Sequence, residues 1–418
     1  MKVLGIVAEY NPFHNGHLYH LRTSKTLIGA DCVVAVMSGN FTQRGEPAVF
    51  DKWARTQMAL LCGVDLVIEL PAPYAMGSAE YFAYGAVKLL DSLGAVSVLS
   101  FGSESGQLES LKQIASIILE EPQDYKAALK EYLCAGNSFP AARQKALSAY
   151  LKARQEKDSL SDALSSPNNI LAVEYLKALM RLDSIITPQT ISRIGNDYRS
   201  AELTGEISSA TSIRELLATT DWNTAKELLT PSMPLSCLDI IEHEMELGRG
   251  PVFPSDFAST ILSKLRSMSV DEISALPYME EGLENRIRVA AEKAGTYDEL
   301  LDQICTRRYP ITRIQRILFS LLIGLTNDSF EAFNGAGGPA YIRILGFNNT
   351  GRSLLSAIKG ETKLPVITKT ADFKNSALAN VPEMLSLEAR ATDQYVLACK
   401  SPSMRISGSE FTRTSIYK

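Results

Sequence analysis

The stretch Val3-Leu-Gly-Ile-Val-Ala-Glu-Tyr-Asn-Pro-Phe-His-Asn-Gly-His-Leu-Tyr-His-Leu21 decides the fold of this chain. Its first part, residues 3–7, is an apolar and largely β-branched run, which predicts a buried strand. Asn11-Pro12 predicts a turn, and a helical pattern begins at His14-Asn15-Gly16-His17. Two histidines three residues apart share one helical face, so this helix start predicts an anion-binding site.

The chemistry suited to such a site is phosphoryl transfer. A helix N-terminus offers unpaired N–H groups and the positive end of the helix dipole, and Gly16 lets an anion approach the backbone closely. His14 and His17 can both donate a ring N–H to one phosphoryl group, which stabilises developing charge without a protein nucleophile. From these residues alone, the alternative is a pair of solvated surface histidines.

The order of a strand followed by H-x-G-H at a helix start resembles the nucleotidyltransferase superfamily, which includes the class I aminoacyl-tRNA synthetases and pantothenate synthetase. The longer string GIVAEYNPFHNGHLYHL resembles more specifically the bacterial tRNA(Met) cytidine acetate ligase family, as does SGNFTQRGEPA at residues 38–48. The resemblance covers most of the chain and is strongest over residues 1–105.

This resemblance implies an ATP-dependent ligase, which activates acetate as acetyl-adenylate and releases pyrophosphate. The acetyl group would then pass to the N4 amine of the wobble cytidine of elongator tRNA(Met), giving N4-acetylcytidine. ATP would serve as the magnesium complex, and the partners would be acetate, ATP and tRNA rather than DNA. The residue that accepts the amine proton is not identifiable from the sequence.

Composition places the chain among soluble globular proteins. Its 418 residues predict two or three domains, and 45% hydrophobic with 21% charged residues can form sizeable cores. Because no apolar run is long enough to span a membrane, we expect a cytoplasmic protein without a membrane partner. The six cysteines form no C-x-x-C pair or cluster with histidine, so we expect free thiols and no structural metal.

Charge is distributed unevenly along the chain. The net charge is −5, yet residues 305–418 carry 15 Lys and Arg against 8 Asp and Glu. The other residues carry 27 basic against 39 acidic side chains. This asymmetry predicts a basic C-terminal region that meets a polyanion, with an ordinary solvated surface as the alternative.

Strand and helix patterns alternate at the start of the chain. Apolar runs at 31–38, 65–70 and 96–101 predict further strands, separated by helical patterns at 17–28, 51–61 and 78–93. The order βαβαβαβ predicts an α/β fold with a doubly wound parallel sheet, as in Rossmann-like nucleotidyltransferases.

Three regions follow from the patterns along the rest of the chain. We expect an ATP-binding catalytic domain over 1–220, with a helical insertion at about 108–164 and a fifth strand around 184–194. Residues 221–330 should form a helical domain, and 331–418 a small α/β unit. Together these form a mostly helical or α+β C-terminal region, whose basic RNA-binding surface begins at about 305.

The loop after the second strand carries further candidates for binding phosphate or acetate. Ligands of parallel sheets lie beyond the carboxyl ends of the strands. Candidate contacts at this edge are Asn40, Gln43, Arg44 and Lys52. Ser209 and Thr211 belong to a stretch, residues 208–214, that resembles the I-S-S-T-x-I-R motif of nucleotidyltransferases, although Ser208 and Ala210 depart from it. A plain surface loop and a plain capped helix are the alternatives.

By resemblance to the family, His14 and His17 are catalytic and the ATP site comprises a continuous stretch and three distant residues. These are Val7, Ala8, Glu9, Tyr10, Asn11, Pro12, Phe13, His14, Asn15, Gly16, His17, Leu18, Tyr19, His20, Gly102, Asn168 and Arg193. Taken singly, Gly102 could be a turn glycine, Asn168 a helix cap and Arg193 part of a structural ion pair.

The C-terminal half carries candidate tRNA contacts. Arginines with a neighbouring aromatic ring suit phosphate contact and base stacking. The candidates are Arg307, Arg308, Tyr309, Arg313, Arg316, Arg343 and Arg352. An arginine-rich helix that is merely solvated is the alternative reading.

Two other functions fit parts of the sequence. An adenylyltransferase of the coenzyme A or NAD pathway type, acting on a small phosphorylated metabolite, could use the same histidines but needs no large basic region. A non-catalytic RNA-binding protein on a decayed nucleotidyltransferase fold would not need intact His14, Gly16 and His17.

Overall fold

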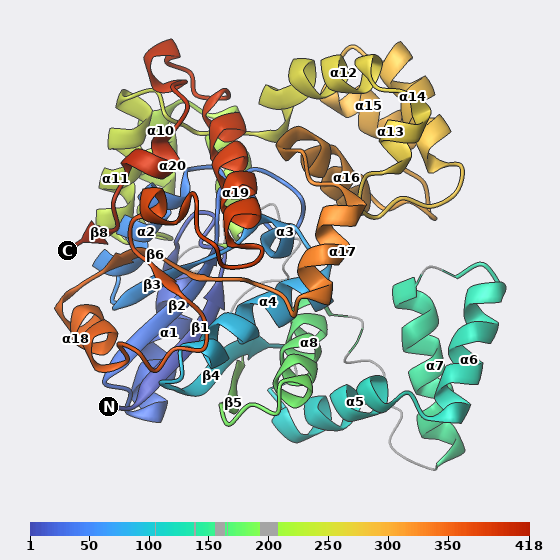
Figure 1. The fold of residues 1–418 in the computed structure, drawn as a ribbon, viewed down its shortest axis with the longest axis horizontal. Helices are drawn as coiled ribbons and strands as arrows, with labels where there is room; N and C mark the ends of the chain where they lie inside the picture. Colours follow the sequence, from blue (N-terminus) through green and yellow to red (C-terminus); the bar gives the residue numbers. More distant parts are fainter. Residues whose placement is uncertain (105, 138, 155–163, 165, 193–207) are drawn as a thin grey trace.

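The computed structural model describes residues 1–418 except 105, 138, 155–163, 165 and 193–207 (Figure 1). In this part of the chain the strands form one eight-stranded sheet of order β5-β4-β1-β2-β3-β6-β7, with β8 beside β6. The strands are β1 (Val3–Ala8), β2 (Cys32–Ser38), β3 (Leu66–Leu70), β4 (Val96–Ser103), β5 (Thr187–Ser192), β6 (Ile342–Phe347), β7 (Val366–Ile367) and β8 (Ile416–Tyr417).

The first five strands are parallel to one another, and the sheet is mixed only where β6 pairs antiparallel with β3. The predicted α/β fold is therefore confirmed, and the sheet, predicted to be parallel, is parallel except at the β3–β6 pair. The apolar run of strand β2 is continuous because both faces of this strand are covered. Val34 and Val36 face one hydrophobic core, whereas Val33 and Ala35 face the other.

Helices cover both faces of the sheet (Figure 1). The core on one face takes side chains from α4 (Ala79–Ser92), α5 (Leu108–Glu120) and α8 (Pro167–Arg181). The core on the other face takes side chains from α1 (Asn15–Ile28), α2 (Lys52–Leu61), α9 (Ala210–Thr219) and α11 (Leu235–Glu246). The helix starts agree with local sequence signals, because Asp51 caps α2 by accepting from the Ala54 N–H.

Residues 331–418 differ from the expected separate unit in how their strands pair. Strands β6, β7 and β8 extend the sheet begun by β1–β5, rather than forming a sheet of their own. The β3–β6 pair, with Glu69 opposite Arg343, covers backbone groups that β3 would otherwise leave unpaired at its edge. The division of the chain into three regions stays a prediction.

The remaining helices lie mainly in the middle and at the end of the chain. Figure 1 shows α6 and α7 projecting from the sheet, and α12–α16 grouped above them. These elements are α3 (Ala72–Ala75), α6 (Gln123–Cys134), α7 (Phe139–Ala153), α10 (Trp222–Leu229), α12 (Ala258–Ser267), α13 (Val270–Ser274), α14 (Leu283–Lys293), α15 (Tyr297–Ile304), α16 (Ile311–Ile323), α17 (Asn327–Gly335), α18 (Asn349–Ala357), α19 (Val381–Val396) and α20 (Ser409–Thr412), with 3₁₀ turns η2 (Pro254–Phe257), η3 (Thr370–Phe373) and η4 (Pro402–Met404). Of the helices described, none has the length and apolar character needed to cross a bilayer.

Candidate active site

His14 and His17 cap the start of α1 reciprocally. The His14 Nδ1 atom accepts a hydrogen bond from the Gly16 N–H at 3.0 Å, and the His17 Nδ1 atom accepts from the His14 N–H at 3.3 Å. This is the geometry of a capping box, with two imidazoles in place of the usual hydroxyl and carboxylate. The spacing of three residues is therefore what the cap requires.

The cap also decides which ring nitrogens can act on a ligand. A backbone amide always donates, so each Nδ1 atom that accepts from it carries no proton, and the proton of the neutral ring lies on Nε2. The two ring centroids are 3.8 Å apart. His14 and His17 thus form one pair of neighbouring Nε2–H donors at the positive end of α1, whose first turn contains no acidic side chain.

The turn between β1 and α1 is held in place from several directions. Tyr10 has a positive φ of 47°, which costs a non-glycine residue conformational energy. The Asn11 side chain accepts from the Val49 N–H at 2.7 Å, and Arg214 of α9 donates to the Asn11 carbonyl at 2.8 Å. The buried Arg55 of α2 donates to the Glu9 carbonyl at 2.6 Å. The surrounding contacts therefore stabilise the turn that presents the histidine pair.

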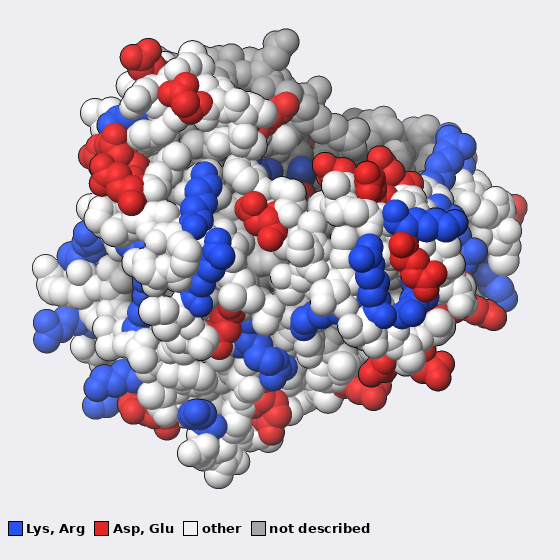
Figure 2. Space-filling model, turned by 90° about the horizontal axis from the view of Figure 1, so that it is seen from above, with Lys and Arg blue, Asp and Glu red and all other residues white. Residues whose placement is uncertain are grey.

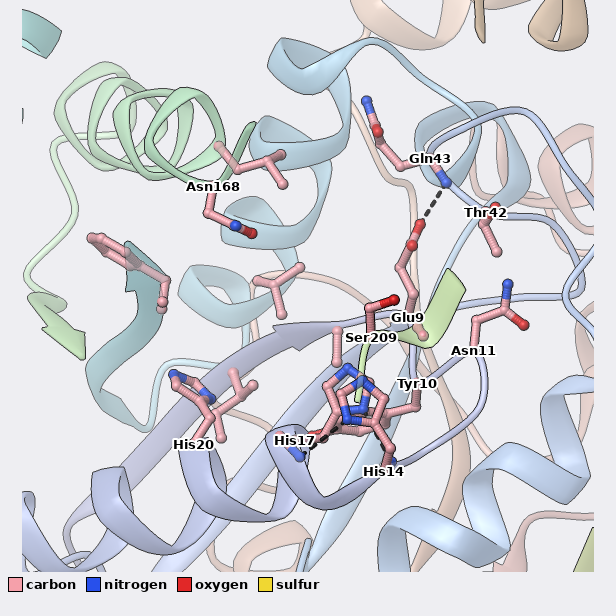
Figure 3. Close-up of a pocket in the computed structure, with 18 of the residues that line it drawn as sticks. Glu9, Tyr10, Asn11, His14, His17, His20, Thr42, Gln43, Asn168 and Ser209 are labelled. Atoms are coloured by element: carbon pink, nitrogen blue, oxygen red, sulfur yellow. Dashed lines mark hydrogen bonds between the residues drawn. The ribbon is translucent and has the colours of Figure 1, made fainter. Parts of the chain in front are cut away.

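A cavity of about 250 Å³ lies at the carboxyl edge of the sheet, above the histidine pair. Its wall is formed by the end of β1, the start of α1, the loop after β2, the ends of β4 and β5, and the starts of α8 and α9. Figure 3 shows the histidine pair on the floor, with Asn168 and His20 on one side and Gln43 and Thr42 on the other. The cavity lies where parallel α/β sheets bind their ligands.

Glu9 lies between the histidine pair and the loop after β2 (Figure 3). Its Oε1 atom accepts from the Gln43 N–H at 2.6 Å. Burial raises the pKa of Glu9 above its ordinary value, although the Gln43 N–H and the guanidinium groups of Arg214, Arg44 and Arg55 act in the opposite direction.

The loop after β2 is anchored to α16. Arg316 donates through Nε and Nη2 to the Gln43 carbonyl at 3.0 and 2.9 Å, and the Gln315 amide donates to Glu46 at 2.9 Å. Gly45 has a φ of +74°, and a Cβ there would lie 2.5 Å from the Arg316 backbone nitrogen. The C-terminal half thus supports one wall of the cavity directly.

Comparison with known proteins identifies this architecture. Residues 1–409 match the family model described as HIGH Nucleotidyl Transferase. A curated protein of Acetivibrio thermocellus, named tRNA(Met) cytidine acetate ligase, is 51% identical over 416 residues and covers 100% of both chains. A protein of the same name from Thermoanaerobacter sp. is 46% identical, and the match covers 98% of each chain.

The chain belongs to the tRNA(Met) cytidine acetate ligase family, within the HIGH nucleotidyltransferases. Two crystal structures of one protein share this fold along the whole chain. The apo crystal structure of Thermotoga maritima TmcAL, at 38% identity, superposes with a TM-score of 0.95 and covers 100% of this chain and 99% of its own. A second crystal structure of that protein, bound with alpha-thio ATP, gives a TM-score of 0.93 at the same identity and coverage.

Most residues predicted for the family's ATP site lie at the cavity. Those in its wall are Val7, Ala8, Glu9, Tyr10, Asn11, His14, Gly16, His17, Tyr19, His20, Gly102 and Asn168. Gln43, Arg44, Ser209 and Thr211 lie there as well. Ser209 also caps α9, since its hydroxyl accepts from the Ser212 N–H at 3.0 Å. The sequence therefore located most of one wall of the cavity.

Four residues of the predicted ATP stretch do not line the described cavity: Pro12, Phe13, Asn15 and Leu18. Phe13 is completely buried in the core beside Tyr10, and the Asn15 amide donates to the Pro231 carbonyl at 2.9 Å. A continuous stretch of turn and helix cannot direct every side chain to one side. Arg193 lies outside the described residues.

Two of the predicted phosphate or acetate contacts require correction. Lys52 is fully buried, with its Nζ atom 2.6 Å from a carboxylate oxygen of Glu69 and 2.6 Å from one of Glu410. Asn40 is 1% exposed and donates to the Thr392 hydroxyl at 3.2 Å. Neither side chain reaches the cavity, because α19 and α20 cover this part of the sheet edge.

The predicted tRNA contacts divide by exposure. Arg307 and Arg352 are exposed, and the Arg308 side chain is 70% exposed. Arg313 binds the Tyr278 carbonyl and Glu280, Arg316 binds the loop after β2, and Tyr309 is largely buried. The prediction for Arg343 is wrong, because this side chain is 1% exposed and lies beside Glu410 inside the protein.

Sequence reasoning missed several residues of the cavity wall. Arg214 is the last residue of the hydroxyl-rich stretch 208–214. Because guanidinium groups bind phosphates, its place in that stretch could have predicted a phosphate contact. Leu171 and Tyr175 follow Asn168 by three and seven residues on α8, so helical periodicity could have placed them on the same face. Phe82 of α4 carried no signal in the sequence.

Proposed function

We propose that this protein is an ATP-dependent ligase that acetylates the cytidine of tRNA(Met), as the names of its relatives state for them. The single observation that carries the proposal is the pair of Nε2–H donors that His14 and His17 direct to the cavity at the start of α1. Two such donors favour chemistry at a phosphate, where charge develops on non-bridging oxygens.

In the first step, acetate attacks the α-phosphorus of ATP, acetyl-adenylate forms and pyrophosphate leaves. The Nε2–H groups of His14 and His17 stabilise the negative charge that develops on the α-phosphate. Arg44, Arg214 and Ser209 lie in the cavity wall and are suited to the remaining phosphates. Together they hold the two reactants close enough to react.

Magnesium would enter this site as part of its substrate. Mg²⁺ keeps several waters and binds readily through the phosphates of ATP, so few protein ligands are needed. Within the described residues no group of three or more His, Cys, Asp or Glu side chains is arranged to hold a metal.

In the second step, the N4 amine of the wobble cytidine of elongator tRNA(Met) takes the acetyl group and AMP leaves. A base in an anticodon loop can be splayed out of its stack and enter such a cavity. Figure 2 shows one face of the protein, on which Lys and Arg side chains are interspersed with Asp and Glu. The exposed Arg307 and Arg308 precede α16, whose Arg316 holds the cavity loop, so tRNA bound there would lie close to the site. These reactants are cytoplasmic, and we place the reaction in the cytoplasm.

The direct test is incubation of the purified protein with tRNA, ATP and labelled acetate. The expected result is label in N4-acetylcytidine of tRNA(Met), with one AMP and one pyrophosphate formed for each acetyl group transferred. Labelled acetyl-CoA without ATP serves as the control and should give no label. Transfer from acetyl-CoA, or AMP transfer to a small phosphorylated metabolite, would refute the proposal.

A further inference from the structure

The second step of the proposed reaction needs a group that accepts the amine proton. The exocyclic amine of cytidine is a weak nucleophile, and its attack on the acyl group leaves a proton on nitrogen that must be removed. In the described part of the cavity wall, the groups that could act as bases are histidines, tyrosines and two carboxylates, Glu9 and Glu46.

The histidines and tyrosines are poorly suited to this role. The Nδ1 atoms of His14 and His17 already accept backbone N–H groups, so their Nε2 atoms are donors. The His20 Nε2 atom lies 3.3 Å from the Ser100 hydroxyl, on the side of the cavity opposite Gln43 (Figure 3). A phenol, with an ordinary pKa of about 10, is largely protonated at neutral pH and so is a poor base there. Burial raises the pKa values of the Tyr10 and Tyr175 phenols further.

Of the two carboxylates, Glu46 is engaged by α16 through the Gln315 amide at 2.9 Å. Glu9 points into the space between the histidine pair and Gln43 (Figure 3). Its Oε1 atom is fixed by the Gln43 N–H at 2.6 Å, and its own carbonyl is fixed by Arg55. The carboxylate is therefore held in one orientation beside the groups that bind the α-phosphate.

The groups around Glu9 come from five other elements. Arg214 of α9, Arg44 of the cavity loop and Arg55 of α2 favour its charged form. Arg316 of α16 and Tyr175 of α8 also interact with its charge. Burial acts against these cations and is the largest influence, so the pKa of Glu9 is raised. A raised pKa brings a carboxylate closer to neutral pH, where it is a more effective base.

We propose that Glu9 is the general base that accepts the N4 proton of the cytidine during acetyl transfer. In this step the bond between N4 and the acetyl carbon forms. The bond from that carbon to the phosphate oxygen breaks, and AMP leaves with its electron pair. The N4 proton passes to the Glu9 carboxylate. The assignment rests on the proposed function, and it makes Glu9 a catalytic residue of the transfer step in particular.

The test measures the two half-reactions separately in the Glu9→Gln variant. Adenylate formation is followed by acetate-dependent exchange of pyrophosphate into ATP, and transfer by single-turnover acetylation of tRNA with pre-formed acetyl-adenylate. Glutamine keeps the oxygen that accepts from the Gln43 N–H, so the turn should remain intact. We expect transfer to fall by about 10²–10³-fold, and to fall at least tenfold more than adenylate formation does.

Two further variants keep the test informative. Glu9→Asp retains a carboxylate at a shorter reach, so it should recover part of the transfer rate even if Glu9→Gln folds poorly. In the wild type and in Glu9→Asp the transfer rate should decline as pH falls through the pKa of this carboxylate, and in Glu9→Gln that acidic limb should be absent. Glu46→Gln, the matched carboxylate at the same cavity, should lose less transfer than Glu9→Gln.

The outcomes separate the assignment from the function on which it rests. Absence of both half-reactions in the wild-type protein would refute the proposed function itself. If the wild type is active and Glu9→Gln transfers at a near-normal rate, Glu9 is not the base. A loss confined to adenylate formation, with a raised KM for acetate, would assign Glu9 to acetate binding and overturn the proposal. A rate lost with an unchanged pH profile would also overturn it.

Discussion

Two sets of polar side chains lie at the same carboxyl edge of the sheet and have opposite environments. His14 and His17 border the cavity, and the Nδ1 atom of each ring accepts a backbone N–H group, which places the proton of the neutral ring on Nε2. Lys52 is fully enclosed, with carboxylate oxygens of Glu69 and Glu410 each 2.6 Å from its Nζ atom and one of Glu388 at 3.4 Å. From the sequence, the two histidines were candidates for contact with the nucleotide, and Lys52 was a candidate for contact with phosphate or acetate.

The difference shows that charge at a sheet edge is a poor guide to function unless burial is known. In the cluster of Lys52, Glu69, Glu388, Glu410 and Arg343, which we call the buried ion cluster, two cations lie among three carboxylates that are closed off from the cavity. Although burial opposes ionisation, Lys52 and Arg343 hold the pKa of Glu410 below its ordinary value. Burial and the Glu388 carboxylate raise the pKa of Glu69 well above it. The buried ion cluster therefore stabilises the fold, whereas the histidine pair lines the cavity.

The largest expected effect comes from breaking the buried ion cluster with Lys52→Met. Removing the cation leaves buried carboxylates without a partner, so the free energy of unfolding should fall by about 3–5 kcal/mol. Urea denaturation measures this loss. The matched control is Lys25→Met, since Lys25 forms a partly exposed pair with Asp65 at 3.8 Å and should cost about 1 kcal/mol or less. If Lys52→Met and Lys25→Met lowered the free energy of unfolding equally, the buried ion cluster would not have the structural role assigned to it.

The next effect concerns the histidine pair. His14→Ala or His17→Ala should lower the rate of adenylate formation by about 10²–10³-fold, because each removes a donor to the α-phosphate. The stability cost should be about 1 kcal/mol, the value of a lost helix cap. tRNA binding should survive, as measured by filter binding.

A third variant separates the two roles of His14. Asparagine is a good N-cap residue, so His14→Asn should recover stability without recovering the rate. His243→Ala on α11 is the control histidine outside the cavity. Near-normal activity in both alanine variants would refute the assignment of His14 and His17 as donors to the α-phosphate.

The pH dependence of stability offers a smaller and sharper test of the buried ion cluster. Because the pKa of Glu69 is raised, the folded protein holds this proton more tightly, and stability is lost as pH rises above about 4.3 through the folded pKa. Glu410 behaves oppositely: its lowered pKa contributes stability that is lost as pH falls through that pKa.

Glu69→Gln imitates the protonated side chain and should remove the loss at high pH. Relative to the wild type, the variant should gain stability as pH rises through the folded pKa of Glu69, because it has no carboxyl proton to lose. Urea denaturation at a series of pH values from about 4.3 upward measures this difference. If the stabilities of the wild type and Glu69→Gln change with pH in the same way, Glu69 is charged throughout and its pKa is not raised.

The smallest effects distinguish exposed from enclosed arginines of the C-terminal region. Arg307→Glu and Arg308→Glu should weaken tRNA binding by about tenfold at low salt and reduce its salt dependence, without a change in Tm. Arg343→Met should instead lower Tm and leave the affinity of the folded protein for tRNA unchanged. An unaltered affinity in both charge-reversal variants would refute the predicted tRNA surface.

The sequence was most informative where the interactions are local. The run Val3–Ala8 forms a buried strand, the helix begins at the predicted turn, and Asp51, the first residue of the helical pattern predicted over 51–61, caps α2. The spacing of His14 and His17 placed both rings on one face, because three residues make nearly one helical turn. Even so, the sequence did not reveal the capping box, in which the His14 ring accepts the Gly16 N–H and the His17 ring accepts the His14 N–H.

The sequence was least informative where long-range packing determines exposure. Lys52 and Asn40 were predicted to contact phosphate or acetate and Arg343 to contact tRNA, yet α19 and α20 pack over them and help to enclose all three. Glu388, for instance, accepts from the Ala72 N–H at 2.8 Å, across more than three hundred residues of chain. Likewise, β6 carries an ordinary strand pattern that does not specify which sheet edge it joins.

By itself, the sequence determined the strand, the turn and the capped helix that present two imidazoles to an anion, because backbone dihedral preferences and caps act over a few residues. Only the tertiary structure decided which polar groups around that motif stay open to a ligand. Exposure depends on which distant segments pack over a site. Helices α19 and α20 enclose Lys52, while the start of α16 supports the loop beside Glu9 and leaves the cavity open.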